Sequence, residues 1–259
     1  MTAAVPDAPS PYDAPELYDL LFDGLAFDIP FWLATGRAAQ GAVLDVGCGT
    51  GRVLLRLLEA GVDADGIDRS APMLEQLRAR AAARSLEVRA YEGDMRDFTL
   101  PRRYTRAICA FNAFAHCDST DDQLRALRCI REHLEPGGAL VLHMSYPTAS
   151  LWLGPDGEPV FEIASKHPLN DHTLEVWDTR FKDIVNQHQR SEVEIRELDA
   201  SGRLVDSQRF ETTQRWVYRY ELELLLMLAG FARSEIFGGF DGEPLDDQNS
   251  QMVVWAWRE

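Results

Sequence analysis

The chain has 259 residues, of which 46 % are apolar and 26 % charged, a composition typical of a globular protein with one large domain or a domain carrying an insertion. Acidic residues outnumber basic ones by 42 to 26, and the net charge of −16 disfavours binding to phosphate backbones and anionic membranes. We therefore expect a small-molecule substrate, and neither a nucleic acid nor a membrane as partner.

The cysteines and the N-terminal stretch indicate a cytoplasmic protein. No two cysteines are spaced as Cys-x-x-Cys, which favours reduced thiols over a disulfide framework. The first basic residue is Arg37, so the N-terminal stretch lacks the positive start of a secretory signal. Residues 1–11 contain three prolines and are expected to be loose, whereas residues 12–36 have apolar side chains at helical spacing and are expected to form cap helices.

Residues 43–52 read Val-Leu-Asp-Val-Gly-Cys-Gly-Thr-Gly-Arg and predict a strand, a glycine turn and the start of a helix. Because Gly47, Gly49 and Gly51 have no Cβ, the backbone of this turn can come close to a ligand. A dinucleotide-binding fingerprint would need a third glycine at position 52, where this chain has Arg52.

Polar segments follow the next strands along the chain. Asp68 ends a strand over 64–68, at the place where open α/β folds position an acid for ribose hydroxyls. Residues 93–95, Gly-Asp-Met, follow a shorter strand over 88–91. A fourth strand over 107–111 leads into a segment that ends in His116 and Cys117. A capped helix and a Pro-Gly-Gly turn come before the next strand, at 139–144.

Together these segments resemble the class I S-adenosylmethionine-dependent methyltransferases, in particular those that methylate amines and amino sugars. The resemblance covers most of residues 12–144 and, more loosely, 215–257. It implies an α/β fold: a Rossmann-like seven-stranded sheet with an antiparallel last strand and helices on both faces. It also implies S-adenosylmethionine as the cofactor and S-adenosylhomocysteine as the product.

The resemblance also implies the residues that contact the cofactor. Asp68 is expected to accept the ribose hydroxyls and Asp94 the adenine amine, while Met73 is either an adenine contact or ordinary core. The full set of expected cofactor contacts is Tyr18, Asp45, Gly47, Cys48, Gly49, Gly51, Arg52, Asp68, Arg69, Met73, Gly93, Asp94, Met95, Phe111 and Asn112.

Residues 146–218 are expected to form a small antiparallel β insertion on the substrate side of the methyltransferase domain, which spans 12–259. Prolines and glycines across 145–172 predict a long loop. Alternating apolar and polar residues predict three strands, with a hairpin turn at 199–202 before the last of them. The expected later elements are strands at 174–181, 193–198 and 204–217, a helix at 221–228, and closing strands at 233–237 and 251–257.

His116 is the candidate catalytic residue, because histidine titrates near neutral pH and this one follows the fourth strand. It could act as a base, orient the substrate, or only hold the loop. The candidate substrate contacts are Tyr12, Phe114, Tyr146, Trp177, Arg180 and Trp216. No spacing of His, Cys, Asp and Glu resembles a metal site, so none is expected.

Three functions compete at this stage. The first is a methyltransferase that moves a methyl group to nitrogen, or less favourably oxygen, of a small molecule by in-line displacement. The second is a non-catalytic module that binds S-adenosylmethionine. The third is a nicotinamide-dependent oxidoreductase, which Arg52 at the third glycine position argues against. The sequence leaves open whether the protein is a homodimer.

Overall fold

The computed structural model of the protein describes residues 9–167 and 170–259. Of the segment 1–11 that was expected to be loose, residues 1–8 lie outside the described residues. Pro9 accepts a backbone hydrogen bond from Glu211, and Ser10 caps a short 3₁₀ helix. Among the residues described, no helix is both long and apolar enough to cross a membrane.

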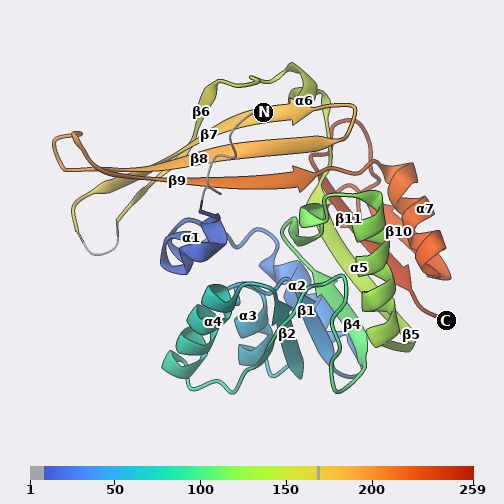
Figure 1. Ribbon diagram of the computed structural model, residues 1–259. Coiled ribbons are helices and arrows are strands. Elements are labelled where there is room, and N and C mark those ends of the chain that lie inside the picture. Colours follow the sequence, from blue (N-terminus) through green and yellow to red (C-terminus); the bar gives the residue numbers. More distant parts are fainter. Residues whose placement is uncertain (1–8, 168–169) are drawn as a thin grey trace, which may run out of the picture.

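A seven-stranded sheet with strand order β10-β11-β5-β4-β1-β2-β3 forms the centre of the domain (Figure 1). Its strands are β1 (Val43–Val46), β2 (Ala64–Asp68), β3 (Arg89–Glu92), β4 (Tyr104–Cys109), β5 (Leu134–Ser145), β10 (Arg233–Phe237) and β11 (Gln251–Trp257). β1 to β5 are parallel to one another, and β11 is antiparallel to both of its neighbours. The predicted Rossmann-like sheet with an antiparallel last strand is therefore confirmed.

Helices cover both faces of this sheet, as predicted. The helical elements are η1 (Pro11–Asp13), α1 (Pro15–Phe22), α2 (Ile29–Arg37), α3 (Leu54–Glu59), α4 (Ala71–Ala83), η2 (Ala113–His116), α5 (Thr120–His133), α6 (Ala149–Leu153) and α7 (Arg219–Ala229). α2, α3 and α4 pack in one apolar cluster, and α5 and α7 pack in the other. β1 is buried along its whole length, as expected for a central parallel strand.

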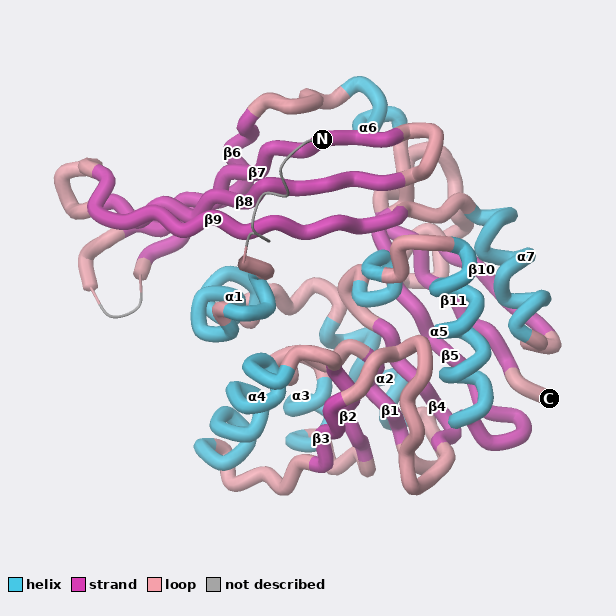
Figure 2. The backbone as a smooth tube through the Cα atoms, viewed as in Figure 1, coloured by secondary structure: helices cyan, strands magenta, loops and turns pink. Residues whose placement is uncertain are grey.

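A second, four-stranded antiparallel sheet lies beside the first, with strand order β6-β7-β8-β9 (Figure 2). Its strands are β6 (Pro159–Lys166), β7 (Thr173–Asp183), β8 (His188–Leu198) and β9 (Leu204–Arg215). The predicted three-stranded insertion thus gains a strand, and the long loop predicted over 145–172 is wrong at α6 and β6. β6 is a mostly exposed edge strand that starts with a proline, so it carries no apolar alternation to reveal it.

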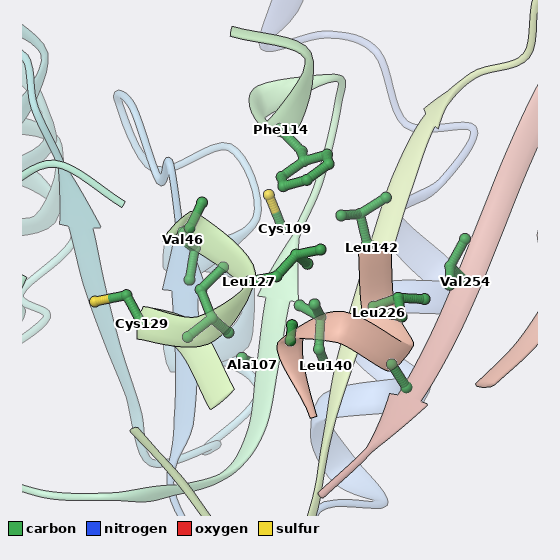
Figure 3. Packing of buried hydrophobic residues seen from close by; sticks show 14 of the residues in the cluster. Val46, Ala107, Cys109, Phe114, Leu127, Cys129, Leu140, Leu142, Leu226 and Val254 are labelled. Atoms are coloured by element: carbon green, nitrogen blue, oxygen red, sulfur yellow. The ribbon is translucent and has the colours of Figure 1, made fainter. Parts of the chain in front are cut away.

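The core on the α5–α7 side of the large sheet is closely packed. Figure 3 shows Phe114, Cys109, Leu142 and Leu127 pointing toward one another between η2, the strands and α5. All four side chains are buried in one cluster. This packing fixes η2 at the carboxyl end of β4, directly above the sheet.

Gly51 provides a test of the turn between β1 and α3. Its φ is +90°, and an added Cβ would lie 2.2 Å from Leu77 Cδ1 and 2.8 Å from Leu55 Cγ. We expect Gly51→Ala to lower the free energy of unfolding by about 2–4 kcal/mol, because backbone strain and overpacking add. Gly61→Ala is the matched control, since Gly61 has a φ of +75° and open space around it. In urea unfolding, equal losses for the two variants would contradict the packing argument.

Candidate active site

The first cavity lies at the carboxyl ends of β1, β2, β3 and β4, where the strand order reverses and open α/β sheets bind ligands. It encloses about 820 Å³, part of which is open to solvent. Of the expected cofactor contacts, it is lined by Tyr18, Gly47, Gly49, Asp68, Arg69, Met73, Gly93, Asp94, Met95 and Phe111. The fold thus brings together residues that are up to 93 positions apart in the sequence, from Tyr18 to Phe111.

Asp68 ties the glycine turn to the end of β2. Its Oδ2 accepts the Gly49 N–H at 2.8 Å, and its Oδ1 accepts the Ser70 N–H at 2.9 Å. Burial raises the pKa of this carboxyl group, while the two backbone hydrogen bonds oppose that shift. Each oxygen keeps acceptor capacity toward the cavity, so Asp68 suits a pair of ribose hydroxyls.

Asp94 is held in place by Arg96. Arg96 Nε donates to Asp94 Oδ1 at 2.8 Å and Nη2 donates to Oδ2 at 2.6 Å, while Nη1 reaches Asp122 at 3.1 Å. The hydrogen bonds from Arg96 lower the pKa of the Asp94 carboxyl group. The backbone N–H of Arg96 takes a third acceptor site, on Oδ1. Because a carboxylate offers about four such sites, Asp94 can still accept an amine. Arg96 itself is a cavity residue that the sequence analysis missed.

A small cavity adjoins the first one beside the glycine turn and is lined by Asp45, Cys48 and Arg52, among others. Arg52 donates twice to the buried Asp28, with both distances 2.6 Å, and its guanidinium lies 4.6 Å from the centre of the Phe111 ring. Burial raises the pKa of Asp45 to about 7. Asp45 in this small cavity suits the ammonium of an amino-acid tail, whereas Arg52 is held by Asp28 and by the Leu25 carbonyl and supports the turn. Glycine turn, acids and tail site together therefore fit the expected cofactor.

Gly51 and Asn112 differ from the other expected cofactor contacts. Gly51 packs against Leu77 and Leu55 and lines neither the first cavity nor the small one, so its effect on a ligand is through the turn. Asn112 faces the second cavity described below, and its side-chain amide pairs with Ser145.

Phe111 and Asn112 form a strained turn between β4 and η2. Their φ values are +52° and +62°, in the left-handed region that ordinary side chains rarely adopt. His143 Nδ1 accepts the Phe111 N–H at 3.2 Å, and His143 Nε2 is 2.5 Å from Gln251 Oε1. These contacts hold the Phe111 ring where it lines the first, second and small cavities.

His116 lies at the end of η2 and lines the first cavity. Its Nδ1 is 3.2 Å from the Thr213 carbonyl oxygen, and its Nε2 is 2.6 Å from the Tyr12 hydroxyl. A carbonyl can only accept, so the proton of neutral His116 is on Nδ1 and the Tyr12 hydroxyl donates to Nε2. Burial, and then the charge of Arg69, lower the pKa of His116.

The second cavity lies between α1 and the four-stranded sheet and encloses about 740 Å³, part of it open to solvent. Tyr12, Tyr18 and Phe111 line both this cavity and the first, so the two adjoin at these rings. Most of its wall was not predicted, because the alternation of apolar and polar residues in a strand does not tell which face of the sheet α1 covers. The missed wall residues include Leu17, Leu21, Val176, Val193, Ile195, Phe210 and Thr212.

Five of the six expected substrate contacts lie away from these cavities, and only Tyr12 is placed at them. Phe114 is fully buried in the core, because the tight 3₁₀ turn directs it inward while Ala113 and His116 face the first cavity (Figure 3). Tyr146 and Trp216 belong to an aromatic cluster with Trp152 and Tyr218.

Trp177 and Arg180 also line none of these cavities. Trp177 alternates with the inward Val176 and packs on the other side of the sheet against Phe161 and Arg196. Arg180 is paired with Asp178 and Glu162. Among the described residues, no group of three or more His, Cys, Asp or Glu side chains is placed to hold a metal ion.

Comparison with known proteins supports the same chemistry. Residues 43–138 match the methyltransferase domain family. A cypemycin N-terminal methyltransferase from a Streptomyces species is 28 % identical over 256 residues, which cover 97 % of this chain and 99 % of the relative. A dTDP-3-amino-3,4,6-trideoxy-α-D-glucopyranose N,N-dimethyltransferase of Streptomyces venezuelae is 31 % identical over 137 residues, covering 50 % of this chain and 56 % of the relative. The solved CcbJ methyltransferase of Streptomyces caelestis superposes with a TM-score of 0.78 at 25 % identity, over 96 % of this chain and 99 % of that one.

Asp45 predicts a pH-dependent affinity for S-adenosylmethionine. With a pKa of about 7, Asp45 is mostly neutral at pH 6 and mostly ionised at pH 8, and a cationic ligand favours the ionised form. We expect the dissociation constant, measured by titration calorimetry, to fall about tenfold between these pH values. Asp45→Asn should flatten this dependence, and a flat profile in the unaltered protein would contradict the assignment. The free energy of unfolding of the ligand-free protein should change with pH in the opposite direction. Because the pKa of Asp45 is raised by folding, its contribution to stability is lost as pH rises from about 4 to 7.

Proposed function

The chain is a class I S-adenosylmethionine-dependent methyltransferase, and from this premise we propose that it methylates a neutral amine nitrogen of a small molecule held in the second cavity. S-adenosylmethionine supplies a methyl group activated by the positive charge of its sulfonium. The protein's main task is then to hold the acceptor atom in line with that methyl group, and such positioning can supply roughly 7–11 kcal/mol of the barrier.

The observation that carries the choice of nitrogen is the state of His116. Among the described residues that line the first cavity, His116 is the one histidine, and it is hydrogen-bonded to Tyr12, which lines both cavities. Its Nε2 lone pair already accepts the Tyr12 hydroxyl, and burial lowers its pKa. A hydroxyl acceptor would need a free base to take its proton before or during attack. A neutral amine carries its own lone pair and needs no such base.

The names of two similar proteins agree with nitrogen. One is named an N-terminal methyltransferase, and the other an amino-sugar N,N-dimethyltransferase. The two names point to different acceptors, so the acceptor of this chain has to be argued from its own cavity.

We place the amine N–H against Tyr12 Oη, which faces both cavities. The nitrogen lone pair forms the N–C bond as the methyl–sulfur bond breaks, and the nitrogen then loses one proton. Tyr12 Oη receives that proton while passing its own to His116 Nε2. Burial raises the pKa of Tyr12, so the tyrosine stays neutral throughout, and the lowered pKa of His116 favours loss of the proton to solvent. Tyr12 and His116 thus orient the amine and relieve it of a proton after transfer.

Acceptors that differ in one atom test the choice of nitrogen. With phenethylamine and phenethyl alcohol on the same skeleton, we expect methylation of the amine and none of the alcohol. The attached position is found by mass spectrometry and NMR of the product. Because the amine must arrive neutral, its turnover should rise with pH. Methylation at oxygen, or equal turnover of both, would refute the proposal.

Tyr12→Phe tests the role of the hydroxyl. We expect kcat to fall about 10-fold to 100-fold because the amine loses its hydrogen-bond partner and its path for the proton. The affinity for S-adenosylmethionine, measured separately, should change by no more than about threefold. Tyr220→Phe is the control, since Tyr220 is 72 % exposed on α7. If kcat is unchanged in Tyr12→Phe, the hydroxyl has no part in the reaction.

A further inference from the structure

We infer that the second cavity selects amines carried on an apolar body without a negative charge, and rejects those with a free carboxylate or phosphate beside the amine. This inference rests on the proposed function, since it names the class of acceptor for that same site.

The floor of the cavity is an apolar stripe across three strands. Val176 of β7 pairs with Ile195 of β8, and Val193 of β8 pairs with Phe210 of β9. Because side chains two apart along a strand share a face, these four project to the same side of the sheet. Val176, Ile195 and Phe210 are at least nine-tenths buried.

The opposite wall is α1, which presents Leu17 and Leu21 to the same cluster. Among the described residues that line the cavity, no Asp, Glu, Lys, Arg or His occurs. The polar groups that line it are neutral, and the Asn112 amide is already paired with Ser145. A carboxylate or phosphate placed here would therefore lose its water without gaining a cationic partner, which is strongly unfavourable.

Arg180 lies on the same side of the sheet but is not free to receive an anion. Its Nε donates to Asp178 Oδ2 at 2.7 Å, and its Nη2 donates to Glu162 Oε1 at 2.6 Å. Two carboxylates thus already face one guanidinium. Asp178 Oδ1 is buried with no hydrogen-bond partner among the described contacts, so it adds negative potential on this side of the sheet. An anion on this side of the sheet would be repelled rather than bound. Arg69, whose charge acts on Tyr12 and His116, lines the first cavity and not the second, so it leaves the wall of the second cavity without a cation.

Three acceptors on one skeleton test the inference: phenethylamine, phenylalanine amide and phenylalanine. The amide and the free acid have nearly the same shape and differ in the charge of the group beside the amine. We express kcat/KM per concentration of neutral amine, because the ammonium groups of the three compounds differ in pKa and only the neutral form reacts. On that scale we expect kcat/KM for phenylalanine to be at least 100-fold below that for the other two, which should agree within about tenfold. Equal turnover of phenylalanine and its amide would overturn the inference and leave the proposed amine methylation standing.

A binding measurement separates the two proposals. The same three compounds are titrated into the complex of the protein with S-adenosylhomocysteine. If phenylalanine binds weakly and the other two compounds bind well, the inference is supported, even if no methyl is transferred. If no bound amine is methylated, the proposed function is contradicted. Binding of phenylalanine as tight as that of its amide overturns the inference.

A filled cavity tests where these compounds bind. Ile195→Trp should lower kcat/KM for phenethylamine at least tenfold and leave the affinity for S-adenosylmethionine unchanged. Val205→Trp, at a position 47 % exposed on β9, is the matched control and should change neither quantity. If Ile195→Trp keeps full turnover of phenethylamine, the acceptor does not use the second cavity.

Discussion

The position of α1 is the constraint on which both cavities depend. Its acidic side faces the large domain: Asp19 accepts from Arg80 at 2.6 Å and from Gln76 at 3.0 Å, and it also accepts the Thr50 hydroxyl. Its apolar side packs on the four-stranded sheet. A helix of eight residues is too short to be stable alone in water, so these contacts create its order. Remove them, and the first cavity loses Tyr18 while the second loses a wall.

The acidic side of α1 also connects this helix to the glycine turn. Arg80 reaches from α4 to Asp19, Asp23 and the carbonyl of Thr50, which lies inside the turn. Arg80 and Asp19 are mostly buried, with 13 % and 15 % of their side chains exposed, so salt screens this pair less than it would a surface pair. These contacts hold α1 and the glycine turn in a fixed position relative to each other. To move α1 away from the first cavity, several charged contacts must break at once.

How far the sequence predicts this protein differs between its two halves. The large sheet and the cofactor follow from the sequence, because a buried parallel strand, three glycines and later acids at strand ends have one arrangement in an open α/β sheet. The acceptor half was predicted only as an antiparallel insertion. Val176 and Trp177 are neighbours with similar apolar character, and only the docking of α1 decides which of them faces the cavity. The sequence likewise does not tell whether Phe114 or His116 is buried. The tight turn of η2 directs Phe114 into the core and His116 toward the first cavity.

Two segments far apart along the chain build the wall of the second cavity together. Residues 9–22 supply η1 and α1, residues 159–215 supply the sheet, and a backbone hydrogen bond joins Glu211 to Pro9 directly. A hybrid that combines the four-stranded sheet of one protein with the N-terminal helix of another would join two walls that do not fit each other. To transfer a new specificity onto this fold, both segments must therefore be exchanged together.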